Sequence, residues 1–163
     1  MTDPDLSAKQ EGHEDPYDVL IIGGGQSGLA TAYYVRKKTD NFLILDNQEK
    51  PGGAWLHVWD SMTLFSASSF SNLPGLPMPS SPGYPTKDHV IRYLTTYEER
   101  YHLPVRRPVT VTDIAYDGEF FLVNKTWKAR EIIGATGTWS SPFIPSYPCL
   151  LYTSDAADDL LCV

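Results

Sequence analysis

The chain has 163 residues and a formal net charge of −7, which is long enough for one domain with its own hydrophobic core. Its sequence holds no apolar run of the roughly eighteen residues that a transmembrane helix needs. Both cysteines lie within the last fifteen residues, which excludes a disulfide framework, a thiolate zinc site or a C-x-x-C redox pair from the rest of the chain.

The acidic charge is confined to the two ends of the chain. Residues 1–16 carry five acids and one lysine without an apolar block, which is typical of a disordered leader rather than a secretory signal. Residues 149–163 add three acids, so acids and bases balance in residues 17–148. No basic field favours nucleic acid and no basic amphipathic helix favours a membrane. We expect a cytoplasmic protein. Nothing in the sequence indicates an oligomeric state, and no metal site is predicted.

A glycine-rich turn follows the first predicted strand. Residues 18–22 form a short apolar run, G-x-G-x-x-G spans Gly23 to Gly28, and residues 29–35 continue as a helix. Gly23 permits the tight turn, Gly25 lets a pyrophosphate approach the backbone, and Gly28 lets the helix pack on the strand. The N-terminus of the helix then offers N–H groups and a positive dipole end to phosphates. The alternative is an ordinary β-turn-α junction without a ligand.

A second strand, residues 42–46, ends in an acid 23 residues after Gly23. Asp46 thus stands where a carboxylate accepts hydrogen bonds from an adenosine ribose. With no arginine beside it in the sequence, it favours FAD or NAD over NADP. Gly-Gly-Ala-Trp at 52–55 then predicts a backbone that approaches a flat or phosphorylated ligand, the alternative being a plain turn with a core tryptophan.

The rest of the chain is predicted to be an irregular loop, a helix and a β-meander. Five prolines rule out long regular elements in residues 57–85, which pack on a ligand or simply cover the domain. Thr86 is the expected N-cap of a helix that runs to about His102. Strands are expected at 105–116, 119–124 and 127–135, the first two joined by a hairpin at Asp117-Gly118. The predicted fold class is α/β, a Rossmann-like FAD/NAD(P)-binding fold with an inserted helix and an antiparallel β-meander.

Four motifs in this order resemble the N-terminal part of the flavin-containing monooxygenases, which are related to the Baeyer–Villiger monooxygenases. They are Gly23–Gly28, the acid Asp46, Gly52–Trp55 and the run Ala135-Thr136-Gly137-Thr138-Trp139. The resemblance covers residues 17–148. Within it, the pattern from Gly53 to Thr86 is most similar to a bacterial branch linked to arsenic or metal resistance.

The resemblance implies an enzyme that uses FAD and NADPH and inserts one oxygen atom from O₂ into a small substrate, with the chemistry belonging to the flavin. It implies that the glycine turn, with Gln26 and Ser27, lines the FAD pyrophosphate, and that Asp46 binds the ribose. The other implied cofactor-binding residues are Gly53, Ala54, Trp55, Val111, Ala135, Thr136 and Gly137. Val111 would offer its backbone to the adenine. The catalytic residues stay unknown, because the residues that contact the substrate in this family mostly lie in its other half.

The resemblance ends after Pro148, before the second G-x-G-x-x-G that would bind NADPH. Residues 149–158 can be encoded by TGTCTCTTATACACATCTGACGCTGCCGAC, which resembles the transposase-end adapter of DNA libraries. We therefore expect 17–148 to be a C-terminally truncated FAD-binding domain, inactive alone, and 149–163 to be a non-native tail. The alternative for the tail is a short amphipathic segment at 155–161.

Three other interpretations of the whole chain stay open. One is a two-dinucleotide flavoprotein of the thioredoxin-reductase type, which the lack of a cysteine pair in residues 17–148 disfavours. Another is a single-domain NAD dehydrogenase, which the predicted meander disfavours. The third is a nucleotide-binding module without catalytic activity.

Overall fold

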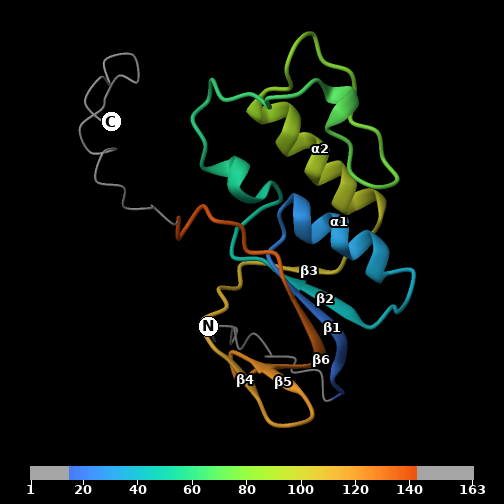
Figure 1. Ribbon diagram of the computed structural model, residues 1–163, viewed down its shortest axis with the longest axis vertical. Coiled ribbons are helices and arrows are strands. Elements are labelled where there is room, and N and C mark those ends of the chain that lie inside the picture. The colour runs from blue at the N-terminus through green and yellow to red at the C-terminus, as the bar shows by residue number, and fades with distance from the viewer. Residues whose placement is uncertain (1–14, 143–163) are drawn as a thin grey trace, which may run out of the picture.

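The computed structural model describes residues 15–142, which form one mixed sheet with two helices packed against one of its faces (Figure 1). The described elements in chain order are β1 (Tyr17–Ile22), α1 (Gln26–Val35), β2 (Phe42–Leu45), η1 (Gly53–Leu56), η2 (Ser68–Phe70), α2 (Lys87–Arg100), β3 (Val105–Arg106), β4 (Ile114–Tyr116), β5 (Phe121–Val123) and β6 (Trp127–Gly134). The predicted tail, 149–163, and all but the last two residues of the predicted leader, 1–16, lie outside the described residues. No helix within 15–142 is long and apolar enough to cross a membrane.

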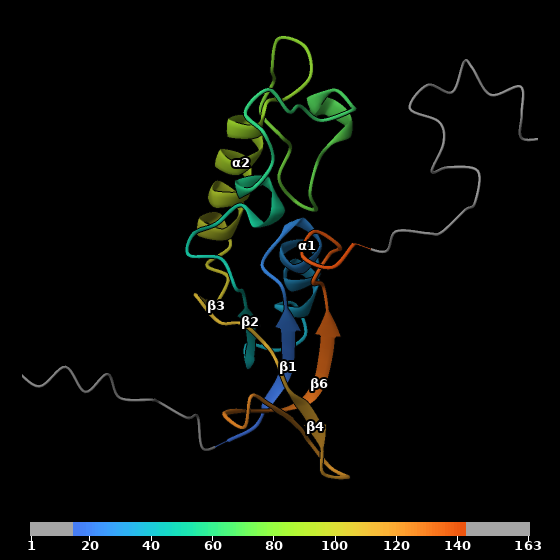
Figure 2. The ribbon, with the colours of Figure 1, turned by 90° about the vertical axis from the view of Figure 1, so that its left-hand side faces the viewer.

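The strand order in the sheet is β3-β2-β1-β6-β5-β4. The first four of these strands run parallel, with Ile21 of β1 level with Ile44 of β2 and Ile133 of β6. β5 pairs antiparallel with β6, and β4 pairs antiparallel with β5 at the edge of the sheet. Figure 2 shows β1 and β6 side by side and pointing the same way, toward the end of the sheet where α1 begins. The carboxyl ends of the three longest parallel strands therefore meet at one edge, where α/β proteins bind ligands.

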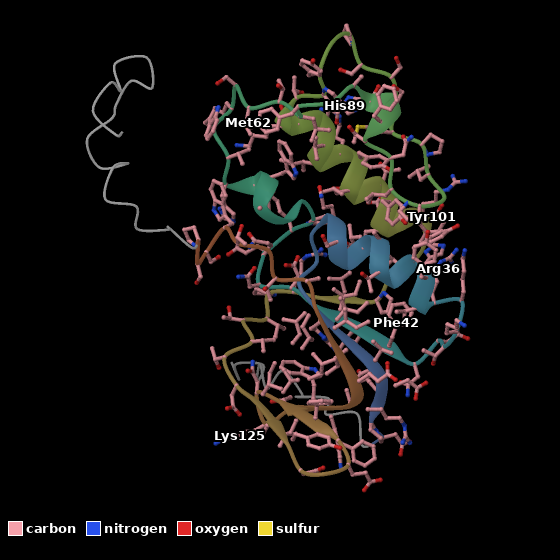
Figure 3. The ribbon with its side chains drawn as sticks, in the orientation of Figure 1. Arg36, Phe42, Met62, His89, Tyr101 and Lys125 are labelled. Atoms are coloured by element: carbon pink, nitrogen blue, oxygen red, sulfur yellow. The ribbon has the colours of Figure 1, made fainter. Side chains whose placement is uncertain are left out.

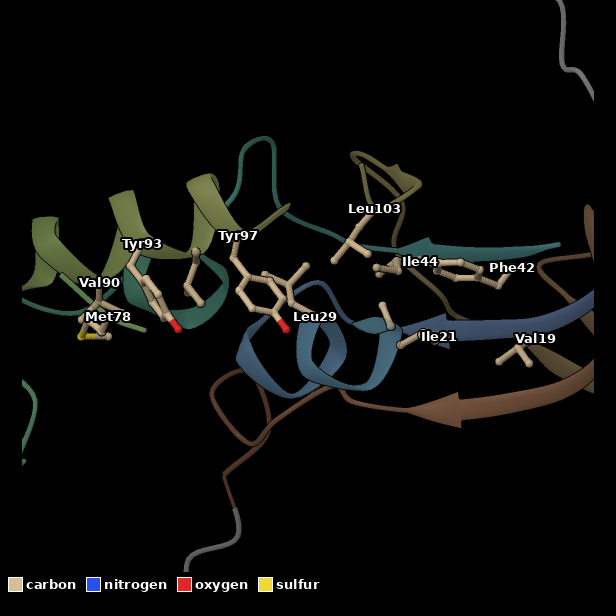
Figure 4. Packing of buried hydrophobic residues seen from close by; sticks show 12 residues of the cluster. Val19, Ile21, Leu29, Phe42, Ile44, Met78, Val90, Tyr93, Tyr97 and Leu103 are labelled. Carbon is tan, nitrogen blue, oxygen red and sulfur yellow. The ribbon is translucent and has the colours of Figure 1, made fainter. Parts of the chain in front are cut away.

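The buried strands alternate their side chains between two hydrophobic clusters. Ile21 and Ile44 belong to the cluster on the helix side, in which Tyr97 of α2 lies beside Leu29 of α1 (Figure 4). Leu20 of β1 points to the opposite face, where the meander strands β5 and β6 cover it. Since both faces of β1 and β2 are covered, their sequences are continuously apolar rather than alternating.

Helix α2 begins where the sequence predicts. The Thr86 hydroxyl accepts a hydrogen bond from the His89 amide at 3.4 Å, and Asp88 lies in the first turn. The helix ends at Arg100, two residues earlier than expected. Figure 3 shows the C-terminal ends of both helices together, where the Arg36 guanidinium lies 4.6 Å from the centre of the Tyr101 ring.

The proline-rich loop is fastened to α2 by two tyrosine hydroxyls. Tyr93 accepts a hydrogen bond from the Leu73 amide and donates one to the Leu76 carbonyl, both at 2.6 Å. Tyr97 donates to the Pro74 carbonyl at 2.7 Å. Burial raises the pKa of the Tyr97 hydroxyl, so it remains protonated and able to donate throughout the physiological range. This part of the loop covers the domain's own core.

The expected strand 105–116 is wrong. The structure has β3 at one edge of the sheet, paired with β2, and β4 at the opposite edge, with an irregular segment at 107–113 between them. Pro108 has no N–H to give to a strand ladder, and Arg107 turns inward to bind two carboxylates. The antiparallel meander is therefore β4, β5 and β6 alone.

The hairpin between β4 and β5 turns one residue later than predicted. Tyr116 pairs with Phe121 and the Asp117 amide donates to the Phe120 carbonyl at 3.1 Å, which leaves Gly118-Glu119 as the two-residue turn. Gly118 has a φ of +102°, a conformation that glycine adopts without strain.

Asp117→Ala is expected to lower the thermal midpoint near neutral pH, and the difference from wild type should shrink in acid. The backbone amides of Phe120 and Glu119 donate to the Asp117 carboxylate at 2.7 and 2.9 Å and lower its pKa below the ordinary value. The ionised carboxylate therefore stabilises the fold above the ordinary titration range of aspartate, and this stabilisation is lost as the pH falls through the lowered pKa. Thermal melts at about pH 6 and about pH 3 test this. Asp113→Ala, an exposed aspartate of the same region, is the control, and an equal loss at both pH values would contradict the prediction.

Candidate functional site

The glycine-rich turn at the end of β1 is hydrogen-bonded to the ends of β2 and β6. The Gly23 amide donates to the Leu45 carbonyl at 2.8 Å, and the Ala135 amide donates to the Ile22 carbonyl at 2.8 Å. Gly23 has a φ of +110°, and a Cβ placed there would overlap the Ala135 carbonyl oxygen. Only glycine fits, and the turn thereby lies directly against the predicted exit segment 135–137.

The next two motif glycines differ in what surrounds them. A Cβ on Gly28 would overlap the Gly23 carbonyl oxygen, so this glycine lets α1 pack on the turn. A Cβ on Gly25 would meet no atom within 4 Å, and Gly25 has an ordinary extended backbone with a φ of −80°. Gly25 is also the N-cap of α1 and makes no side-chain cap, although Ser, Asp or Asn would stabilise a helix there. Neither packing nor backbone conformation explains this glycine.

Asp46 follows β2 and is almost fully buried beside the turn. A Cβ on Gly24 would lie 2.6 Å from its Oδ2, so the carboxylate packs against glycine backbone. Arg107 Nε donates to the same Oδ2 at 2.7 Å. No arginine neighbours Asp46 in the sequence, but in the folded protein Arg107 lies directly beside it, so the premise that no arginine lies there is wrong. Arg107 lies 61 positions away and arrives through the irregular segment 107–113.

Arg107 is held by a second carboxylate. Its Nη1 and Nη2 donate to Oε1 and Oε2 of Glu98 on α2, at 2.7 and 2.8 Å. Burial opposes the charge of the guanidinium, but the hydrogen bonds to Glu98 and then to Asp46 outweigh it and raise the pKa of Arg107. The two carboxylates thus keep a buried arginine charged behind the turn.

The Gly-Gly-Ala-Trp run forms the short 3₁₀ helix η1. A Cβ on Gly53 would lie 2.8 Å from the Gly25 Cα, and Gly53 has a φ of +54°. The Trp55 amide donates to the Gly52 carbonyl at 3.2 Å. Here too, glycine allows two backbones to approach, and η1 becomes a wall of the same site.

These segments enclose a cavity of about 330 Å³ at the carboxyl ends of β1, β2 and β6. Its size lies within the range of small-molecule sites. Twelve predicted site residues line it: Gly23, Gly25, Gln26, Ser27, Asp46, Gly53, Ala54, Trp55, Val111, Ala135, Thr136 and Gly137. Gly28 is the exception, since it lies in α1 and is buried against the backbone of Gly23. Val111 reaches the cavity from the irregular segment 107–113 rather than from the expected strand.

Several residues that line the cavity were not predicted from the sequence. His57 Nε2 lies 2.6 Å from Gln48 Oε1, and the His57 ring stacks on Trp139 with 6.5 Å between ring centres. Thr110 lines the cavity as well. No residue pattern marks His57 as a site residue, and only its place directly after η1 could have suggested it.

The proline-rich loop contributes less to this cavity than its aromatic content suggests. Trp59 and Phe65 are 62% and 87% exposed and do not line it. Phe70 borders a second cavity of about 290 Å³ between the loop and α2. Asn72 accepts a hydrogen bond from the Met78 amide at 2.7 Å, so its side chain holds the loop itself.

Comparison with known proteins gives one family and several relatives. The family model of the pyridine nucleotide-disulphide oxidoreductases matches residues 20–154. A flavin-containing monooxygenase from Stenotrophomonas maltophilia has a similar structure, with a TM-score of 0.76 and 45% identity over 82% of this chain and 42% of that one.

Two relatives by sequence come from a bacterium and a plant. An uncharacterized CzcO-like oxidoreductase from Geobacillus kaustophilus is 36% identical over 80% of this chain and 38% of that protein. The indole-3-pyruvate monooxygenase YUCCA1 of Oryza sativa subsp. japonica is 28% identical over 83% of this chain and 37% of that protein. The chain spans about two fifths of the length of the relatives it matches.

Proposed function

The chain belongs to the pyridine nucleotide-disulphide oxidoreductase family of FAD-dependent enzymes, and from this we propose that residues 17–148 are the FAD-binding part of a flavin monooxygenase. The proposed enzyme takes electrons from NADPH and inserts one oxygen atom from O₂ into a small-molecule substrate. The likeness to the flavin-containing monooxygenase of Stenotrophomonas maltophilia, at 45% identity, supports the monooxygenase assignment over other members of the family.

Gly25 is the observation that carries the proposal. Its backbone is unstrained and a Cβ would point into empty space, so the fold itself tolerates any small residue. The cavity explains the glycine, because a side chain at the N-cap of α1 would occupy the space that a pyrophosphate needs. The donor set fits as well, since the first amides of α1 have no carbonyl partner within the helix and point toward the cavity end.

The remaining cavity residues suit the other parts of FAD. Asp46, at the end of β2, would accept hydrogen bonds from the adenosine ribose. Val111 would border the adenine, and the η1 residues Gly53 and Trp55 would lie along the pyrophosphate and flavin. When bound, FAD supplies the electron and oxygen chemistry. The chain's own part is to orient the cofactor and exclude water from it.

Gly25→Asp is expected to abolish binding of FAD and ADP while leaving the fold intact. Aspartate is a better N-cap than glycine, so the free energy of unfolding should stay the same or rise by a few tenths of a kcal/mol. The thermal midpoint of the free protein should therefore be unchanged or slightly higher. Its carboxylate would stand where the pyrophosphate is proposed to bind and would repel it. Isothermal titration calorimetry with ADP and flavin fluorescence with FAD measure the two affinities.

Gly25→Asn is the matched control, since it adds the same volume without charge. We expect it to weaken binding less than Gly25→Asp does. Wild-type affinity for both ligands in Gly25→Asp would contradict the proposed site. FAD-dependent NADPH oxidation by the 163-residue chain would contradict the expectation that this segment is inactive alone.

A further inference from the structure

Arg107 stands behind the cavity rather than in it. Its side chain is 10% exposed and lies between the carboxylates of Asp46 and Glu98. Asp46 lines the cavity, whereas Arg107 and Glu98 do not. Arg107 therefore touches no ligand in the cavity, and its contact with the site passes through Asp46.

The contacts of Asp46 fix how its carboxylate is presented. Oδ2 accepts from Arg107 Nε at 2.7 Å and packs on the backbone of Gly24, where even a Cβ would come within 2.6 Å. Its main chain is held as well, because the Asp46 amide donates to the Arg106 carbonyl and its own carbonyl accepts from Val109. Within the described part of the chain, Oδ1 takes part in no hydrogen bond, so it is the oxygen left for a ligand hydroxyl.

The Glu98 side of the arginine anchors this arrangement to α2. The two parallel hydrogen bonds to Glu98 hold the guanidinium plane in one orientation, a geometry that arginine offers and lysine does not. Two carboxylates share one guanidinium, so the group as a whole carries excess negative charge. Arg107 is therefore not a free cation that could receive a phosphate on the ribose.

We propose that Arg107 is a positioning residue, which together with Glu98 orients Asp46 toward a ribose 2′-hydroxyl and makes the site reject a 2′-phosphate. This inference rests on the proposed function, because it takes the cavity to be the site of an adenine nucleotide. It adds a specificity determinant that lies outside the cavity and on two other elements of the fold.

The test compares ADP with 2′-deoxy-ADP, which lacks the hydroxyl that Asp46 would bind. For the wild-type chain we expect ADP to bind roughly tenfold more tightly, the effect of one hydrogen bond to a charged group. Arg107→Lys keeps the charge but cannot bond Asp46 and Glu98 in the same fork, so the preference for ADP should fall at least threefold. Affinity for 2′-deoxy-ADP should hardly change. A purely structural role for Arg107 would instead weaken both ligands equally, and that result would overturn the inference.

Glu98→Gln is the second variant, since it removes one charge and leaves the Arg107–Asp46 pair in place. We expect it to narrow the gap in affinity between ADP and ADP carrying a 2′-phosphate, again by about threefold or more. The matched controls are Arg106→Lys and Glu99→Gln, exposed neighbours that should match wild type with all three nucleotides. An unchanged gap in Glu98→Gln would overturn the charge part of the inference.

Asp46→Asn separates this inference from the proposed function. If Asp46→Asn loses the preference for ADP while Arg107→Lys keeps it, the positioning role is wrong and the proposed site stands. If the wild-type chain binds no adenine nucleotide, the proposed function fails, and the inference fails with it.

Discussion

Arg107→Met should destabilise the fold by about 3–5 kcal/mol, because it leaves two carboxylates without their counter-charge in a buried position. The side chains of Asp46 and Glu98 are only 4% and 16% exposed, so water cannot replace the guanidinium without opening the contact between α2 and the turn. Denaturant unfolding followed by circular dichroism near neutral pH measures the loss.

Two further variants make this first experiment decisive. Arg106→Met removes an exposed arginine one residue earlier and should change the free energy of unfolding by less than about 0.5 kcal/mol. The triple variant D46N/E98Q/R107M removes all three charges together and should recover a large part of the stability, since the penalty comes from unpaired charge. If Arg107→Met and Arg106→Met unfold at the same denaturant concentration, the buried ion pairs contribute nothing to stability.

Gly28→Val is expected to be almost as damaging, at about 3 kcal/mol or more. The first side-chain carbon would overlap the Gly23 carbonyl oxygen, and that oxygen belongs to the backbone and cannot turn aside. Helix α1 would have to move away from β1 and separate the apolar contacts of Leu29. The gain in helix propensity over glycine is well below 1 kcal/mol and cannot offset such a shift.

The control for Gly28→Val lies three residues earlier in the same motif. Gly25→Val places the same side chain where no atom lies within 4 Å, so it should cost at most about 1 kcal/mol in stability and should affect ligand affinity instead. Thermal melts of both variants without ligand, followed by ADP titration of the folded one, separate the structural glycine from the ligand-facing one. Equal melting temperatures for the two variants would show that the overlap at Gly28 is relieved at little cost.

Local sequence signals predicted the first half of the fold well. The apolar runs, the glycine spacing and the capping threonine each act over a few residues, and β1, α1, β2 and α2 lie close to where they place them. All of these depend on the residues' own backbone preferences.

Long-range contacts account for what the sequence did not reveal. Arg107 meets Asp46 across 61 positions, and no periodicity links a residue near a proline to the end of a distant strand. The apolar alternation of 105–116 predicted one strand, but the burial of Arg107 interrupts it. His57 and Trp139 come together at the cavity only because η1 and the exit from β6 lie at the same edge of the sheet.

The position of β6 in the sheet bears on the order in which the protein is built during translation. Tyr17 of β1 pairs with Ala129 of β6, more than a hundred positions later, whereas β2 is synthesised soon after β1. Closing so large a loop costs conformational entropy before the contacts between β1 and β6 compensate for it. We therefore expect β1, α1 and β2 to associate on the ribosome while the edge of β1 that pairs with β6 is still unpaired. The cavity needs the exit from β6 as its last wall. A nascent chain should therefore gain the ability to hold a nucleotide only after β6 has emerged, so cofactor capture is expected to follow the pairing of β6 with β1 rather than precede it.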